Sequence, residues 1–464
     1  MQVILGVILL AMCAAGIGAL LLANVRVNSW EFVGLVPGLG SGLLSFGVFV
    51  LMRAGFHLSI AVILGCALAF GLALIGILYA KNNKRNVIIR VDGFRGLSYF
   101  DIALLAAIGA LIIFALLVAV YWPPYAWDAL SIWVVKGRVI NDLGTLAGAG
   151  YGAYGFYPLH VPLLIAMILL GLPIAAFKII FPIYFVLLLF SFGGSLFRLT
   201  HRNHSLTLVF VLMLAATPTL LMQSTVAMAD VIFTYFYISS ALCLLIFVSG
   251  GQTGFALLSG LLVGMASWTR PEGLLYFLIN TFVLAIYLVR HKTRFAIVFP
   301  YLLLFGLFWW PWVRYSGQNT YLTGAALTTA GDIVRLQILW DKLIAVLDYF
   351  RREWMAIETW GAAWVLFGVS VLNLRAGRRN PYLLILILLN VAGLVFTYYS
   401  VPTNTEGLTL EWWLDTGFVR MATHFMPLLL FYAALALGPY VDLTASRYSM
   451  IFSQILEPMN RVSE

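Results

Sequence analysis

The sequence has few charged residues: Asp, Glu, Lys and Arg together make up 10% of its 464 positions, against about a quarter in soluble domains. With 63% hydrophobic residues, this shortage excludes an ordinary soluble protein. Cysteine is also scarce. Cys13, Cys66 and Cys243 all lie inside apolar runs, which leaves no disulfide framework and no metal-ligand spacing in the loops. The net charge of +9 comes from short basic clusters at the ends of apolar runs, a pattern that indicates membrane anchoring and excludes nucleic-acid binding.

Long apolar runs are what the sequence has in place of charge. Crossing the hydrocarbon core takes about 20 apolar residues, and an aromatic content of 15% suits helices that end at lipid headgroups. We expect an all-α polytopic membrane protein with about 13 transmembrane helices. The first run lacks a basic leader and is too long for a signal peptide, so we expect it to be retained. The runs are 2–23, 35–52, 57–80, 101–122, 174–197, 205–222, 230–249, 254–269, 272–289, 295–313, 360–374, 381–399 and 424–440.

Basic clusters beside helix ends set the expected orientation, because such clusters stay in the cytoplasm. The clusters are Lys81, Lys84, Arg85, Arg90 and Arg95; Arg198 and Arg202; Arg290, Lys292 and Arg294; and Arg375, Arg378 and Arg379. With all of them inside, segments 123–173, 223–230, 270–271, 314–359 and 400–423 lie outside.

The apolar stretch 158–172 is surplus in this topology, since the chain crosses an odd number of times between position 123 and Arg198. It reaches only about 22 Å, short of the roughly 30 Å core. We predict that it lies along or dips into the outer interface; the alternative is a short crossing helix beside a misassigned neighbour. A second interfacial helix, amphipathic in composition, is predicted over about 332–355.

The chain divides into three parts by sequence. Residues 1–80 form an N-terminal extension of three helices with few polar groups, residues 81–440 form the transmembrane core, and residues 441–464 form a cytoplasmic tail. We see no internal repeat and no soluble domain.

Asp128 is the first candidate for a functional residue. The sequence Trp122-Pro123-Pro124 ends the preceding helix, because proline lacks the amide donor. Asp128 then falls at the headgroup level between Trp127 and Trp133. A carboxylate there is either a general base, a metal ligand or a helix N-cap.

Further charged residues lie at the same outer rim, where they are functional candidates by default. Asp230 is either an N-cap or a site acid. Arg270 and Glu272, in the turn TRPEG, form either a local ion pair or a fork for a phosphate oxygen. Arg420 and His424 share a helix face and are either interfacial anchors or site residues. His160, which begins the surplus segment after Tyr157, is either a polar tip at the headgroups or a site residue.

These pieces, in their order, resemble the GT-C superfamily of integral membrane glycosyltransferases, which includes protein O-mannosyltransferases and lipid A aminoarabinose transferases. The matching pieces cover about residues 100–440. They are YAWDALSIW, FYPLHVPLL at 156–164, MADVIFTYF, GLLVGMASWTRPEGLLYF at 260–277, and a late outward Arg followed by proline.

The resemblance implies a polyprenyl-phosphate sugar as donor, with a glycan, lipid or protein as acceptor. It makes Asp128 the catalytic base, Asp230 a second acid, and Arg270 and Arg420 phosphate contacts. No cofactor is required, and Ala129, where many relatives carry a second acid, argues against a divalent metal. Around these residues we expect Glu272, His424 and Lys136 on the donor side, and Trp127, Trp133, Tyr157 and His160 on the acceptor or sugar.

The expected function is therefore transfer of a sugar by a single inverting displacement, at the non-cytoplasmic face of the cell membrane, in building the cell envelope. Its transition state would be oxocarbenium-like. The main rival is a glycolipid flippase or secondary transporter, which would place polar groups at the membrane midplane rather than at one rim. A ligase that moves a whole lipid-linked glycan and a purely structural subunit are further alternatives.

Overall fold

The structure is a computed structural model, and it describes residues 2–81, 89–90, 97–200, 202–292, 295–318, 339–400 and 409–438. These residues are almost entirely helical, with one parallel pairing of two residues, β1 (Val27–Asn28) with β2 (Ile89–Arg90). The expected all-α membrane fold is confirmed. The proposed tail, 441–464, lies outside the described residues, as does the first part of the expected helix at 332–355.

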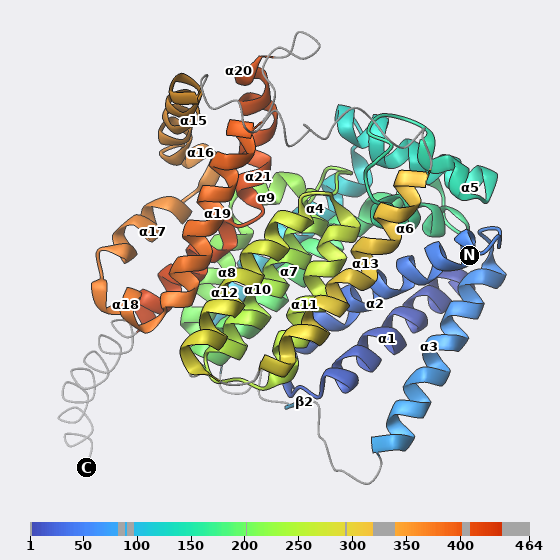
Figure 1. Cartoon of the computed structure of the whole chain (residues 1–464), viewed down its shortest axis with the longest axis horizontal. Helices are drawn as coiled ribbons and strands as arrows, with labels where there is room; N and C mark the ends of the chain where they lie inside the picture. Colours follow the sequence, from blue (N-terminus) through green and yellow to red (C-terminus); the bar gives the residue numbers. More distant parts are fainter. Residues whose placement is uncertain are drawn as a thin grey trace, which may run out of the picture.

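The first half of the chain forms a row of long helices with short irregular pieces between them (Figure 1). Its elements are α1 (Gln2–Ala23), α2 (Ser29–Arg53), α3 (Ile60–Lys81), α4 (Tyr99–Tyr121), η1 (Ala129–Val134), α5 (Val135–Leu143), η2 (Leu146–Gly150), α6 (His160–Leu169), η3 (Ile174–Ile179), α7 (Ile180–Leu199), α8 (His204–Ala215) and α9 (Pro218–Gln223).

The second half adds the most buried helix, α10, and a group of shorter helices at one end of the bundle (Figure 1). Its elements are α10 (Asp230–Val248), α11 (Thr253–Thr269), α12 (Gly273–His291), η4 (Phe295–Ile297), α13 (Val298–Gln318), α15 (Leu339–Trp354), α16 (Ile357–Trp360), α17 (Ala363–Val371), α18 (Leu374–Arg379), α19 (Pro381–Ser400), α20 (Leu410–Trp413), η7 (Leu414–Phe418), α21 (Val419–Thr423) and a last helix, Met426–Gly438.

Nine helices of the described ranges are long and apolar enough to cross a membrane, or ten if the bent pair Leu410–Thr423 and Met426–Gly438 is one span. The chain is thus a multi-pass membrane protein. Three expected runs appear as shorter apolar helices: 205–222 is divided into α8 and α9, 254–269 is α11, and 360–374 contains α17. The count of 13 stays a prediction.

Glycines in α2 let it pack closely against four neighbours, which explains why a glycine-rich run forms a buried helix. A Cβ at Gly40 would lie 1.9 Å from the carbonyl oxygen of Met12 in α1, and one at Gly34 would lie 2.5 Å from the amide nitrogen of Ser191 in α7. Gly38 and Gly42 approach Tyr235 of α10 and Met265 of α11 in the same way. Helix α2 therefore lies inside the bundle.

An ion pair fixes one end of α2. Glu31, which is buried, accepts hydrogen bonds from Arg198 of α7, one of them at 2.6 Å. Asn28 caps α2 and also donates to the carbonyl of Gly194 at 2.9 Å. The N-terminal extension is thus joined to the core by buried polar contacts.

The surplus segment forms α6, whose ten residues measure about 15 Å and cannot cross a membrane. It is enclosed by α2, α5 and η3, and His160–Met167 are buried. The described part of the expected amphipathic helix is α15, which packs on α19 and buries Val346, Tyr349 and Phe350. Both helices lie at the same end of the bundle (Figure 1).

Candidate functional site

Asp230 is the centre of a buried cluster of charges. It is the first residue of α10 and its side chain is fully buried. The carboxylate of Asp230 accepts hydrogen bonds from two arginines: Arg270 donates to Oδ1, and Arg420 Nη2 donates to Oδ2 at 3.2 Å. His424 Nε2 lies 3.3 Å from Oδ1. A buried carboxylate needs such partners, because an unpaired charge away from water is costly.

Arg270 and Glu272 lie in the tight turn between α11 and α12. Arg270 Nη2 is 2.9 Å from Glu272 Oε1, and Nε is 3.2 Å from Oε2, a two-bond fork. Gly273 permits this turn, since a Cβ there would lie 2.3 Å from the Cα of Ser267. Burial alone would raise the pKa of Glu272, but the charge and hydrogen bonds of Arg270 outweigh it and hold that pKa below its ordinary value.

Asp128 joins the cluster from the exposed side. Its Oδ2 is 2.6 Å from Arg420 Nη1, and the two side chains are 23% and 27% exposed. Arg420 thus bridges an accessible carboxylate and the buried Asp230. The π-helical turn η1 directly follows Asp128, and the π-helical turn η7 ends two residues before Arg420. Such turns are frequent at functional sites.

The capping alternatives are wrong for both acids. Asp128 precedes η1 but makes no side-chain capping bond, and the residue before α10 is Ala229, not Asp230. The alternative of a local ion pair is only part of the role of Arg270, because Asp230 shares it. His424 is fully buried and points to Asp230, so it is not an interfacial anchor.

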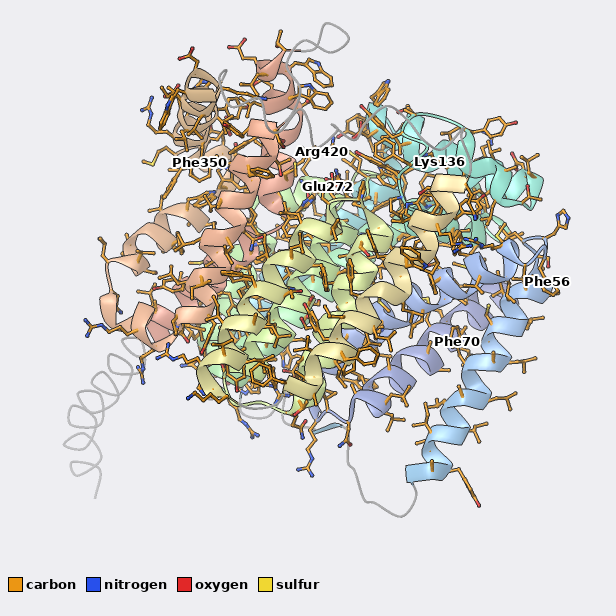
Figure 2. All side chains as sticks on the ribbon, viewed as in Figure 1. Phe56, Phe70, Lys136, Glu272, Phe350 and Arg420 are labelled. Carbon is orange, nitrogen blue, oxygen red and sulfur yellow. The ribbon has the colours of Figure 1, made fainter. Side chains whose placement is uncertain are left out.

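The cluster brings together six residues that the sequence analysis placed on one rim: Asp128, Asp230, Arg270, Glu272, Arg420 and His424. Figure 2 shows Arg420 and Glu272 at the same end of the bundle. Three carboxylates face two guanidinium groups there. Two buried nitrogens, Arg420 Nε and His424 Nδ1, have no hydrogen-bond partner among the described residues.

Aromatic rings line the approach to this cluster. Tyr157 is partly buried, and this desolvation raises its pKa, as does the charge of Glu272. Its ring lies 5.5 Å from that of Trp133 and 5.3 Å from that of Tyr154, and Trp127 packs edge-on against Tyr154 at 6.2 Å. Trp127 is 62% exposed and Trp133 is buried. An exposed Trp beside stacked Tyr rings can cover the apolar face of a sugar.

Two tyrosines of the cluster were missed by the sequence analysis. The ring of Tyr276, one turn into α12, lies 6.1 Å from that of His424. Tyr398, near the end of α19, interacts electrostatically with Arg420 and Glu272. The signal in the sequence was a tyrosine pair closing the apolar run 381–399, which resembles an ordinary membrane-interface belt.

Two predicted site residues lie elsewhere. Lys136 is buried in α5 and donates to the carbonyl of Tyr154 at 2.6 Å, and burial lowers its pKa to about 7. His160 is buried between Ser45 Oγ at 2.6 Å and Tyr184 OH at 3.0 Å. His160 therefore has a partner on each ring nitrogen within the core, and the structure does not bring it to the cluster.

The three carboxylates of this site are paired with arginines. In the ranges that the structure describes, no three His, Cys, Asp or Glu side chains form a set that could hold a metal ion. Comparisons with known proteins found no match to this chain among family models, curated proteins or solved structures. The family expected from the sequence thus remains a prediction.

Proposed function

We propose that the chain is a membrane glycosyltransferase of the GT-C type, with the cluster around Asp230 as its active site and a polyprenyl-phosphate sugar as donor. The observation that supports it best is the bridge made by Arg420 between accessible Asp128 and buried Asp230. It sets a carboxylate that can take a proton beside a cation that can bind a phosphate.

The reaction is a single displacement. A hydroxyl or amine of the acceptor attacks the anomeric carbon, and Asp128 takes the proton that this nucleophile loses. The bond between the anomeric carbon and the phosphate oxygen breaks as the new bond forms, with inversion, and polyprenyl phosphate leaves with the bonding electrons. No cofactor takes part.

Arg420 has two roles in this proposal. In the free protein it is paired with Asp128, with Nη1 2.6 Å from Oδ2. The donor phosphate competes for Arg420, and each hydrogen bond that it takes from Asp128 frees a carboxylate oxygen to accept the proton of the nucleophile. The buried Asp230 keeps the guanidinium in place during the exchange, so that it stabilises the charge that develops on the leaving phosphate.

Arg270, Glu272 and His424 serve mainly to position this pair. All three side-chain nitrogens of Arg270 already bind Asp230 or Glu272, so we assign the phosphate contact to Arg420 first. Trp127 and Tyr157 form the wall for the sugar or acceptor. The buried Trp133 packs against Tyr157, and Lys136 holds the neighbouring Tyr154 by its carbonyl.

We also propose on which side of the membrane the site lies. The site faces the non-cytoplasmic side of the cell membrane, where a rim of charge can meet both a lipid-linked donor and an acceptor from outside. We also propose that α8 with α9, α11, and α16 with α17 supply the additional crossings expected from the sequence.

The test compares purified wild type with Asp128→Asn, measuring release of polyprenyl phosphate from a panel of polyprenyl-phosphate sugars with mixed acceptors. Asp142→Asn is the matched control, because the ion pair of Asp142 with Arg138, both in α5, is exposed. We expect wild type and the control to release phosphate and Asp128→Asn to lose about 10² to 10⁴-fold of the rate. Transport of the lipids across vesicles by wild type, without release or acceptor modification, would support a flippase instead.

A further inference from the structure

A cavity of about 580 Å³ lies at one end of the bundle, far from the charge cluster. That volume is within the range of small-molecule sites, about 300 to 1,000 Å³. The proposed reaction does not use this cavity, and no prediction from the sequence concerned it.

Three helices locate the cavity relative to the cluster. Helix α10 begins at Asp230 and reaches the cavity at Val248, and α12 begins beside Glu272 and reaches it at His291. Helix α19 runs the other way, from Pro381 at the cavity to Tyr398 near Arg420. At 1.5 Å per residue each helix spans about 28 to 30 Å, the thickness of the hydrocarbon core. The cavity and the cluster thus belong to opposite leaflets.

Basic residues surround the cavity. Arg290 of α12 and Arg378 and Arg379 of α18 line it, and all three are exposed. Within the described residues, none of them forms a salt bridge. This contrasts with Arg198, Arg270 and Arg420, each of which has a carboxylate partner. In the part of the chain that the structure describes, no carboxylate pairs with these three guanidinium groups, which leaves them open to an anion from outside.

A polar pair lies beside these arginines. His291 Nε2 is 3.3 Å from the hydroxyl of Tyr382, and both residues line the cavity. The ring of His291 also packs on Tyr287 at 4.5 Å, which holds it at the rim. Hydroxyl and imidazole groups next to arginines suit a phosphate group, because they add directed hydrogen bonds to the charge.

The remainder of the lining is apolar. Leu206, Leu245, Val248, Phe431 and Leu435 contribute to it from α8, α10 and the last helix. Inorganic phosphate has no apolar part that could bury this surface, and a nucleotide has little. The first carbons of an acyl chain would bury it favourably. The lining is therefore complementary to a phospholipid, which has an anionic headgroup and an apolar tail.

We propose that this cavity binds the phosphate headgroup and upper acyl chain of an anionic phospholipid, in the leaflet opposite to the charge cluster. The arginines of three expected cytoplasmic clusters meet here or adjacent to it, since Leu199 and Thr200, next to Arg198, line the same cavity. Clustered arginines between membrane helices on the cytoplasmic side are typical of sites for acidic lipid headgroups.

Native mass spectrometry of the detergent-purified full chain tests the site with two probes, dioleoylphosphatidylglycerol and dioleoylphosphatidylcholine. Arg378→Gln/Arg379→Gln removes two of the cations. Its matched control is Arg351→Gln/Arg352→Gln on α15, which removes the same charge from exposed residues at the other end. We expect the first variant to bind phosphatidylglycerol at least about tenfold more weakly and the control to bind as wild type.

Other readouts separate the lipid from a free anion. Leu435→Trp narrows the apolar part and leaves the arginines, so it should weaken phosphatidylglycerol binding about as much. Millimolar inorganic phosphate should displace little lipid. Equal binding of phosphatidylcholine, unchanged binding by Arg378→Gln/Arg379→Gln in a protein with normal unfolding, or full displacement by inorganic phosphate would overturn the proposal. The outcome does not depend on transferase activity.

Discussion

The carboxylate of Asp128 and the guanidinium of Arg420 form a 2.6 Å ion pair in which both side chains keep about a quarter of their surface exposed. The same guanidinium reaches the fully buried Asp230 at 3.2 Å. A ligand that takes one bond from Arg420 therefore changes the charge balance at an accessible carboxylate while the buried one stays paired.

Replacing Arg420 with lysine tests this bridge. An ammonium keeps the charge but cannot hold two carboxylates with a planar fork. We expect kcat/KM for polyprenyl-phosphate release to fall by about 10² or more, as when one preorganised donor is removed from an active site. The control is Arg138→Lys, because the ion pair of Arg138 with Asp142 is 3.8 Å long and exposed. Unchanged turnover in Arg420→Lys would contradict the proposed role.

Asp230→Asn tests the centre of the cluster. The amide preserves shape but leaves the buried Arg270 and the bridging Arg420 without their shared carboxylate. We expect the free energy of unfolding to fall by about 3 to 5 kcal/mol, the usual cost of breaking a buried pair. Asp142→Asn should cost about 0 to 1 kcal/mol, because its pair is exposed. Denaturant unfolding in detergent measures both, and equal losses would show that Asp230 is not the structural centre.

His160→Leu separates a structural role from a catalytic one. It leaves the buried Ser45 and Tyr184 hydroxyls without their imidazole, so we expect a loss of about 1 to 3 kcal/mol in unfolding free energy. Turnover per folded molecule should stay within about twofold. A large fall in kcat at unchanged thermal stability would instead restore His160 to the site.

The lowered pKa of the buried Lys136 predicts that the stability of the protein depends on pH. Burial lowers its pKa to about 7 in the folded protein, from 10.5 in the open chain. Between these values the unfolded chain binds a proton that the folded protein does not, so stability rises with pH. Below about pH 7 both states are protonated and this contribution levels off. Lys136→Met should therefore lack the rise in apparent Tm that wild type shows from about pH 7 to 10, and parallel curves would contradict the assignment.

The sequence was sufficient to group the charged residues of the cluster, because charges in an apolar chain are few and the basic clusters predict one common side of the membrane for them. It could not separate Asp128 from an N-cap, since Asp at a helix start looks the same in both cases. Only the distant Arg420 decides between them. The same limit explains His160, whose partners Ser45 and Tyr184 lie on other helices, 115 and 24 positions away.

The sequence predicts those features of the fold that depend on the length of an apolar run, but not those that depend on how helices pack. Apolar runs gave the all-α class and most long helices. The run 205–222 hid a break, because Thr217-Pro218 ends α8 and starts α9 without interrupting the hydrophobicity. The glycine-rich run in α2 resembled a weak helix, yet its glycines allow close contact with four others.

The position of α2 also has a consequence for the order of assembly during synthesis. Its Glu31 and Ser45 enter the membrane before Arg198 and His160 have been made. A carboxylate and a hydroxyl in that position lack their final partners until α6 and α7 arrive. Helix α2 is thus made before α6 and α7 but is fixed only when they arrive. A chain that starts after α3 would leave the buried His160 without Ser45 and Arg198 without its acid, so we expect such a truncation to be degraded rather than merely inactive.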